Sequence, residues 1–161
     1  MSTESPLERI LRLRADDDPR EPQTVHEWLR RNGGTSPEGR WTLATFAART
    51  AAGEDFFFGL REFLDGFYGL FTNDHREALV RDRPDDLDDP RLDAFLGALA
   101  EHFAAVHGFD RPAWATERHR FLDRYWFAAE EPGFRAMAVV ESPAAFRRRG
   151  IMITDGLLFR L

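Results

Sequence analysis

The sequence contains no cysteine and no lysine, and it has no long hydrophobic run. Without cysteine the chain can form no disulfide and no zinc–thiolate site, and it offers no thiol nucleophile, which fits a reducing compartment. No window approaches the roughly 18 apolar residues that a membrane-spanning helix requires. The start, Met1-Ser-Thr-Glu-Ser-Pro6, is neither basic nor apolar, as a secretion signal would be. We therefore expect a cytoplasmic protein without a membrane segment.

The common catalytic and metal-binding motifs are also missing. There is no Gly-x-Ser-x-Gly nucleophile elbow, and Gly33-Gly34 is followed by neither a lysine nor a strand-to-helix pattern. His102 and His107 are five positions apart, so on a helix their side chains point about 140° away from each other and do not match the zinc-binding spacing. The sequence predicts no catalytic residue, no metal, no cofactor and no enzyme activity.

Acidic residues dominate the charge of the chain, but not evenly. All 22 basic residues are arginine, and with 28 acids they give a net charge of −6. Residues 84–111 carry seven acids and two arginines, whereas residues 112–161 carry eight arginines and six acids. An acidic chain disfavours general nucleic-acid affinity, because nonspecific binding depends on cations that neutralise phosphates. The predicted partner is a protein, although DNA binding stays open.

Hydrophobic spacing predicts an all-α protein. The 15 phenylalanines suggest a core of large aromatic side chains, or such a core together with an aromatic docking surface. Helical periodicity predicts a main core helix over 55–71 and a very regular helix over 91–106 that Gly108 ends. Further helices are predicted over 6–14, 24–31, 40–52, 73–82 and 134–140. Three glycines in the 55–71 helix, which disfavour helix by about 1 kcal/mol each, indicate close helix approach.

At 161 residues the chain fits a single compact bundle of about seven helices over residues 1–161. The acidic, proline-rich break at 84–90 separates an N-terminal half, 1–83, from a C-terminal half, 91–161. The stretch Arg83–Pro90 holds two prolines and four acids. It is interpreted as a solvated linker or helix cap, with an acidic recognition site as the alternative.

The last third of the chain combines aromatic side chains with a run of arginines. Its pattern predicts a helix from Thr116 to Phe127, and a second helix of about two turns that Ser142 caps and Gly150 ends. The β-branched stretch Ile151–Ile153 permits one short C-terminal strand.

Three consecutive arginines on a helix spread over about 200°, so one is expected to pack inward while two face solvent. Arginines in the last turn can simply complement the helix dipole, and contact with a partner protein or with DNA are the alternatives. Most of the aromatic run is expected to pack in the core. The remaining aromatic and arginine side chains match the composition of protein interfaces. The predicted partner-binding residues are Trp126, Phe127, Phe146, Arg147, Arg148 and Arg149.

Four segments together resemble the C-terminal region of small antitoxin-like proteins of actinobacteria. They are Leu92–His102, Pro112-Ala-Trp114, Arg120-Phe-Leu-Asp-Arg-Tyr-Trp-Phe127 and Glu141-Ser-Pro-Ala-Ala-Phe-Arg-Arg-Arg-Gly-Ile151. In some members of that family the region follows a Cro/repressor-type helix-turn-helix, and the genes lie beside those of predicted nucleotidyltransferase toxins. The resemblance, over residues 85–155, implies an antitoxin or regulator that binds a toxin.

The N-terminal half departs from the regulators of that family. After Gly53 the chain continues Glu54-Asp-Phe-Phe-Phe58, which is acidic and aromatic where a recognition helix needs groups that bind phosphates and base edges. We therefore expect a non-catalytic protein-binding module, the antitoxin-like partner of a toxin encoded nearby, whose acidic 83–90 segment could enter a basic cleft. A transcriptional regulator that binds DNA through Arg147–Arg149 is the alternative.

Overall fold

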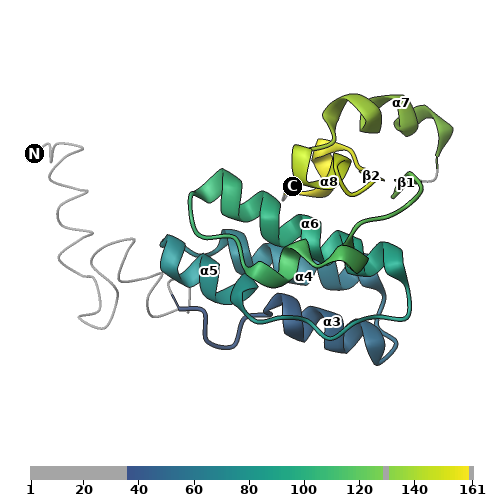
Figure 1. The fold of residues 1–161 in the computed structure, drawn as a ribbon. Coiled ribbons are helices and arrows are strands. Elements are labelled where there is room, and N and C mark those ends of the chain that lie inside the picture. Colours follow the sequence, from purple (N-terminus) through teal and green to yellow (C-terminus); the bar gives the residue numbers. More distant parts are fainter. Residues whose placement is uncertain (1–35, 129–130, 160–161) are drawn as a thin grey trace, which may run out of the picture. The chain divides into compact units, whose positions relative to one another are not determined.

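The computed structural model describes residues 36–128 and 131–159, and it is mostly helical (Figure 1). These residues belong to one compact unit. The predicted helices over 6–14 and 24–31 lie outside the described residues, so a single domain over 1–161 stays a prediction. Within the described part, no helix is both long enough and apolar enough to cross a membrane.

Six α-helices are described, which confirms the all-α fold class. They are α3 (Leu43–Ala51), α4 (Phe56–Tyr68), α5 (Asn73–Arg81), α6 (Pro90–His107), α7 (Pro132–Glu141) and α8 (Ala144–Arg147). Three short 3-10 turns, η1 (Ala113–Thr116), η2 (Arg118–Arg120) and η3 (Asp155–Leu157), and two strands, β1 (Trp126–Phe127) and β2 (Ile151–Met152), complete the described elements.

The first four described helices, α3 to α6, begin and end close to where the sequence predicts. Asp55 caps α4 by accepting a hydrogen bond from Phe58 N–H at 2.8 Å, and Asp89 with Pro90 at the first position starts α6. Gly108 ends α6 in the left-handed conformation, at φ 75°. The cap of α5 is Thr72, whose hydroxyl accepts from His75 N–H. The local capping signals therefore set most of the helix boundaries.

Stacked phenylalanines from α3, α4 and α6 form the centre of the core. The rings of Phe67 and Phe103 lie 4.2 Å apart, and Phe56 meets Phe95 edge-on at 5.3 Å. Helices from both sides of the 84–90 segment contribute to this one core. The close approach of α3 to α4 explains why position 59 is a glycine, because a Cβ atom there would lie 2.6 Å from the Phe46 ring. Gly66 has ordinary space around it, since its nearest neighbour would be 3.5 Å away.

The predicted helix from Thr116 to Phe127 is wrong. The chain forms the turns η1 and η2 and then, after an irregular segment with bends, enters β1, which pairs in parallel with β2. Leu122 N–H donates to the Arg149 carbonyl at 3.1 Å, and Trp126 N–H donates to the Gly150 carbonyl at 2.8 Å. Pairing with a distant segment thus satisfies the backbone groups that a helix would have paired locally.

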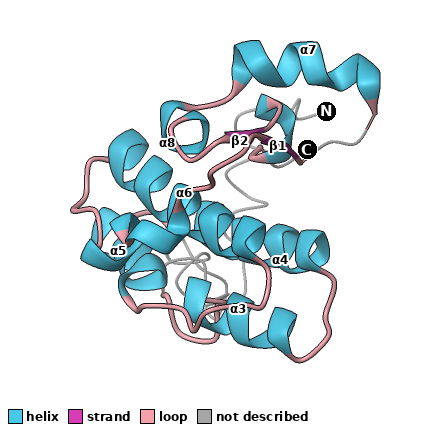
Figure 2. Ribbon diagram, turned by 45° about the vertical axis from the view of Figure 1, so that its right-hand side comes forward, coloured by secondary structure: helices cyan, strands magenta, loops and turns pink. Residues whose placement is uncertain are grey.

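The C-terminal strand is confirmed, but the predicted cap of α8 is wrong. The Ser142 hydroxyl donates to the Ala138 carbonyl at 2.6 Å and accepts from Ile153 N–H at 2.7 Å, and α8 has no side-chain cap. Ser142 therefore ties the end of α7 to the chain after β2. In both views α8 and the two strands lie between α6 and α7 (Figures 1 and 2).

Candidate functional site: an aromatic and arginine cleft

Five side chains line a cleft of about 600 Å³, and they come from α6, from β1 and the residue before it, and from α7. They are Arg91, Tyr125, Trp126, Phe127 and Arg135. We call this set the aromatic cleft. Its three aromatic residues are consecutive in the sequence, whereas the two arginines come from two different helices, α6 and α7.

The strand pairing places the aromatic residues of the cleft. Trp126 pairs with Ile151 and Phe127 with Met152. Gly150 leads into β2 at φ 77°, and a Cβ atom there would lie 3.3 Å from the Arg124 carbonyl, so the close approach of the two segments depends on glycine. Trp126 is partly exposed and meets Phe95 of the core edge-on at 6.2 Å. The core thus fixes one side of the indole, and the other side lines the cleft.

The two arginines of the aromatic cleft lie over its aromatic rings. The guanidinium carbon of Arg91 is 5.5 Å from the Trp126 ring, and that of Arg135 is 5.5 Å from the Phe127 ring. Both distances are within the range of a cation–π contact. These contacts hold positive charge at both sides of the aromatic surface.

The charge in the cleft is only partly neutralised. Arg91 pairs with Asp89 at 2.8 Å. Arg135 has no carboxylate partner among the described residues, and Tyr125 is 73 % exposed. An anionic group could bind Arg135 without displacing a described ion pair, and an apolar or aromatic group could pack on the rings beside it.

The exposed side chains of α7 extend an apolar surface away from Arg135. Only Ala138 is buried in this helix, while four large apolar side chains have exposed fractions between 45 % and 78 %. They are Phe134, Met137, Val139 and Val140. Several exposed apolar side chains on one helix are common at protein interfaces.

The structure separates the predicted partner-binding residues into two groups. Trp126 and Phe127 lie in the aromatic cleft, and Arg147 and Arg148 are exposed, but Phe146 and Arg149 are fully buried. The Phe146 ring packs against Phe95 at 5.1 Å. These two side chains are core residues of the described fold and offer no surface to a partner.

Arg147 is the last residue of α8, Arg148 and Arg149 follow it, and all three have partners within the fold. Arg147 donates to the carbonyls of Val139, Val140 and Ser142, so it caps the end of α7. Arg148 pairs with Glu101 at 3.1 Å. Arg149 donates to the Ala145 and Ala115 carbonyls at 2.8 and 2.6 Å and pairs with Glu101. The expectation that one arginine packs inward and two face solvent is confirmed. The two exposed guanidinium groups nevertheless already bind groups of the same fold.

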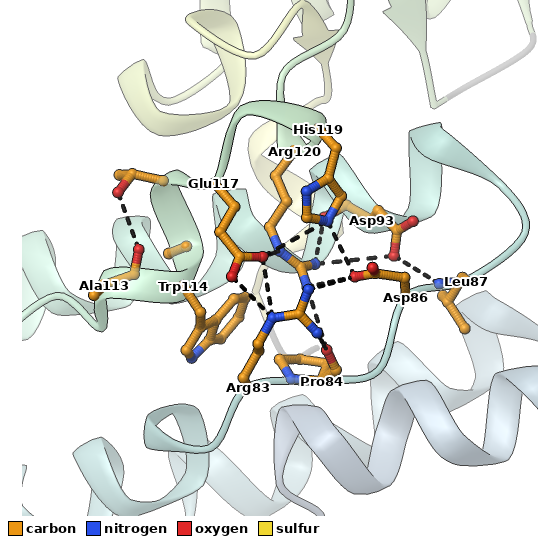
Figure 3. Close-up of polar contacts among 12 residues, drawn as sticks. Arg83, Pro84, Asp86, Leu87, Asp93, Ala113, Trp114, Glu117, His119 and Arg120 are labelled. Carbon is orange, nitrogen blue, oxygen red and sulfur yellow. Dashed lines mark hydrogen bonds and ion pairs between the residues drawn. The ribbon is translucent and has the colours of Figure 1, made fainter.

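Two arginines of the same fold, Arg83 and Arg120, also hold the acidic segment 84–89 that precedes α6, as Figure 3 shows. Asp86 Oδ1 accepts from Arg83 at 2.9 Å and from the buried Arg120 at 3.3 Å, and it lies 3.0 Å from His119 Nε2. Arg120 also donates to the carbonyls of Pro84 and Asp93. The segment is therefore anchored to η2 and α6 rather than forming a detached linker.

Electrostatics within this cluster follow from burial and from the arginines. Burial raises the pKa of Asp93, and the bond from Leu87 N–H and the charge of Arg120 only partly oppose it. Burial would also raise the pKa of Asp86, but the combined effects of Arg83 and His119 hold it below its usual value. The cluster favours an ionised Asp86 beside a buried arginine.

Asp86, Glu117 and His119 bring three potential metal ligands within 4.8 Å of one another. However, Arg83 binds both carboxylates, through Glu117 at 2.9 Å and Asp86 at 2.9 Å. A divalent cation would meet two guanidinium groups, from Arg83 and Arg120, at the same oxygens. The hollow beside His119 is lined by neither Asp86 nor Glu117. We interpret the cluster as a structural anchor.

The histidines of α6 pack against aromatic rings. His102 lies 5.5 Å from Phe103 and 6.1 Å from Phe146, and His107 lies 5.2 Å from Phe67. Burial lowers the pKa of both imidazoles. Both rings therefore favour the neutral form, as part of the core edge.

No family model, curated protein or solved structure matches this chain. The fold and the aromatic cleft are therefore interpreted from their own geometry. The aromatic run is visible in the sequence, but Arg91 and Arg135 carry no local signal that would place them beside it, because the tertiary fold brings them there.

Proposed function

We propose that the protein is a non-catalytic protein-binding module that uses the aromatic cleft. The observation that carries the proposal is the placement of Arg91 and Arg135 over the rings of Trp126 and Phe127, beside the exposed Tyr125. Tyrosine, tryptophan and arginine are the residues most enriched in binding hot spots, because they combine large apolar area with polar groups. The apolar side chains of α7 would enlarge the contact area.

Charge complementarity favours an acidic segment of the partner. Arg135 lacks a described carboxylate partner, so a partner carboxylate would gain a charge-assisted hydrogen bond without first displacing an internal one. Arg147, Arg148 and Arg149 are expected to contribute less to partner binding. Arg147 and Arg149 already donate to backbone carbonyls, and Arg148 pairs with Glu101. Because these arginines already have partners within the fold, and because the net charge is −6, a protein is favoured over DNA as the partner.

In its narrower form the proposal makes the partner a toxin encoded by a neighbouring gene, and the protein its antitoxin. This form rests on the resemblance of residues 85–155 alone. Insertion of the 83–90 acids into a basic cleft is no longer the favoured mode, because Asp86 and Asp89 are already bound to arginines. We propose contact through the aromatic cleft instead.

Co-expression with the product of the adjacent gene, followed by size-exclusion chromatography, tests the narrower form. A toxin–antitoxin pair would elute together at micromolar concentration, and separate elution would reject the toxin as partner. Arg135→Glu should then weaken the complex at least tenfold, because it reverses a charge in the cleft. Arg81→Glu, on exposed α5 surface, is the matched control. Equal effects of the two substitutions would reject the aromatic cleft as the contact surface.

A further inference from the structure

Another hollow, lined by different residues from those of the aromatic cleft, lies between α4 and the C-terminal segment. It encloses about 440 Å³, within the range of roughly 300–1,000 Å³ found for small-molecule sites. Its lining residues are Phe57, Leu60, Arg61, Ala128, Ile153, Thr154 and Leu157. We call it the Arg61 groove. It is independent of the proposed protein-binding function.

The walls of the Arg61 groove are mainly apolar and are held by the core. Leu60 and Ile153 are buried at 1 % and 0 % exposure, whereas Phe57 remains 37 % exposed. The Asp55 cap sets the start of α4 and turns Phe56 into the core, so that Phe57 faces outward at the groove. A rigid apolar wall that remains open to solvent is suited to the hydrocarbon part of a ligand.

One cation lies at this apolar surface. Arg61 follows Phe57 by one helical turn, so both side chains project from the same face of α4. Arg61 makes no hydrogen bond or ion pair with any described residue, in contrast with Arg83, Arg120 and Arg149. The charge of the neighbouring Glu62 acts on Arg49 of α3.

The polar groups of the groove are few and fit an anion. Thr154 lines it, and its hydroxyl has no hydrogen-bond partner in the described part of the chain. None of the described residues that line the groove is acidic. Asp155 follows Thr154, but its backbone N–H binds Glu141, away from the groove lining. A carboxylate would thus find a guanidinium and a hydroxyl beside an apolar wall.

We propose that the Arg61 groove binds a small amphipathic carboxylate, whose carboxylate pairs with Arg61 and whose hydrocarbon chain packs on Phe57, Leu60 and Leu157. The apolar wall supplies contact area, and the guanidinium selects an anionic head group over a neutral one. Thr154 can donate a second hydrogen bond to the same carboxylate. The ligand class follows from these lining residues and their charge.

Isothermal titration calorimetry with octanoate, below its micelle concentration, tests the proposal on the full chain. Octanol is the matched neutral probe. We expect octanoate to bind at least tenfold more tightly than octanol, because only octanoate can form a charge-assisted bond to Arg61. Octanoate that does not bind at millimolar concentration, or binds no better than octanol, would overturn the proposal.

Two substitutions locate the site. Arg61→Gln should weaken octanoate binding about tenfold and leave octanol binding unchanged, while Arg81→Gln, on exposed α5 surface, should change neither. Leu157→Glu, which places a carboxylate in the groove, should weaken octanoate more than octanol. Because Arg61 is exposed, the Arg61→Gln protein should unfold at the same temperature as the parent. Octanoate binding that Arg61→Gln leaves intact would show that the ligand binds elsewhere and reject the assignment.

Discussion

The carboxylate of Glu101 holds the fully buried guanidinium of Arg149, and the same carboxylate reaches Arg148 at 3.1 Å. This pair joins the middle of α6 to the end of α8. Arg149 continues the connection by donating to the Ala115 carbonyl of η1 at 2.6 Å. A single buried side chain therefore links the segment after α8 to α6 and η1, more than 30 residues earlier, and it contributes to the placement of β2 and the aromatic cleft.

Replacing Arg149 should destabilise the protein far more than replacing Arg148. Arg149→Met leaves the largely buried Glu101 with one fewer cation and two buried carbonyls without donors, so we expect a loss of about 2–4 kcal/mol. The Arg148 side chain is 45 % exposed, and Arg148→Met should cost less than about 1 kcal/mol. Urea unfolding gives both values. Equal losses would contradict the assigned difference in burial.

Replacing Arg120, which anchors the acidic segment, should likewise lower the free energy of unfolding more than replacing the exposed Arg83. Arg120→Met leaves Asp93 buried with its cation removed, and we expect a loss of about 3 kcal/mol at neutral pH. Arg83→Met should cost less than about 1 kcal/mol, because its side chain is 41 % exposed.

A double variant checks the cause of that loss. Adding Asp93→Asn to Arg120→Met removes the unpaired buried charge while keeping an acceptor for Leu87 N–H, so part of the stability should return. Strictly additive losses in urea unfolding would show that the Asp93 charge is not what Arg120 compensates.

Stability should fall on acidification below pH 6.5, because burial lowers the pKa values of His102 and His107 from their usual 6.5. Between the folded and unfolded pKa values the unfolded chain binds more protons, so the free energy of unfolding decreases as pH falls. The contribution is fully present above pH 6.5.

Urea unfolding at pH 7.5 and pH 5.5 measures this effect. The double variant His102→Gln/His107→Gln should lose less stability over this interval than the parent does, since two of the groups that take up protons on unfolding are gone. An identical pH dependence of the two proteins would show that other groups cause the acid sensitivity.

Replacing Gly59 and Gly66 of α4 by alanine should change the stability of the protein in opposite directions. At Gly59 a Cβ atom would lie 2.6 Å from the Phe46 ring, so Gly59→Ala should destabilise the protein by about 1–3 kcal/mol. At Gly66 the nearest neighbour would be 3.5 Å away, and Gly66→Ala should stabilise by about 0.5–1 kcal/mol through helix propensity. Thermal unfolding distinguishes the two. A gain in stability at Gly59 would contradict the close packing of α3 on α4.

Local sequence signals determined the helical class and the first four described helices. Asp55, Asp89 with Pro90, and Gly108 act on hydrogen bonds within one or two turns of their own positions, so the sequence alone reveals them. The periodic phenylalanines of α4 and α6 likewise identify the faces that meet in the core. These features depend only on neighbours along the chain.

Only the tertiary structure decided the form of the last third. The stretch from Thr116 to Phe127 has helical spacing, yet its backbone pairs with residues 149–152, and that pairing depends on the buried Arg149 and on the conformation of Gly150. The same fold buries Phe146 and brings Arg91 and Arg135 to the aromatic residues. Long-range hydrogen bonds and ion pairs leave no periodic signal, which is why the sequence showed the aromatic run but not the cleft around it.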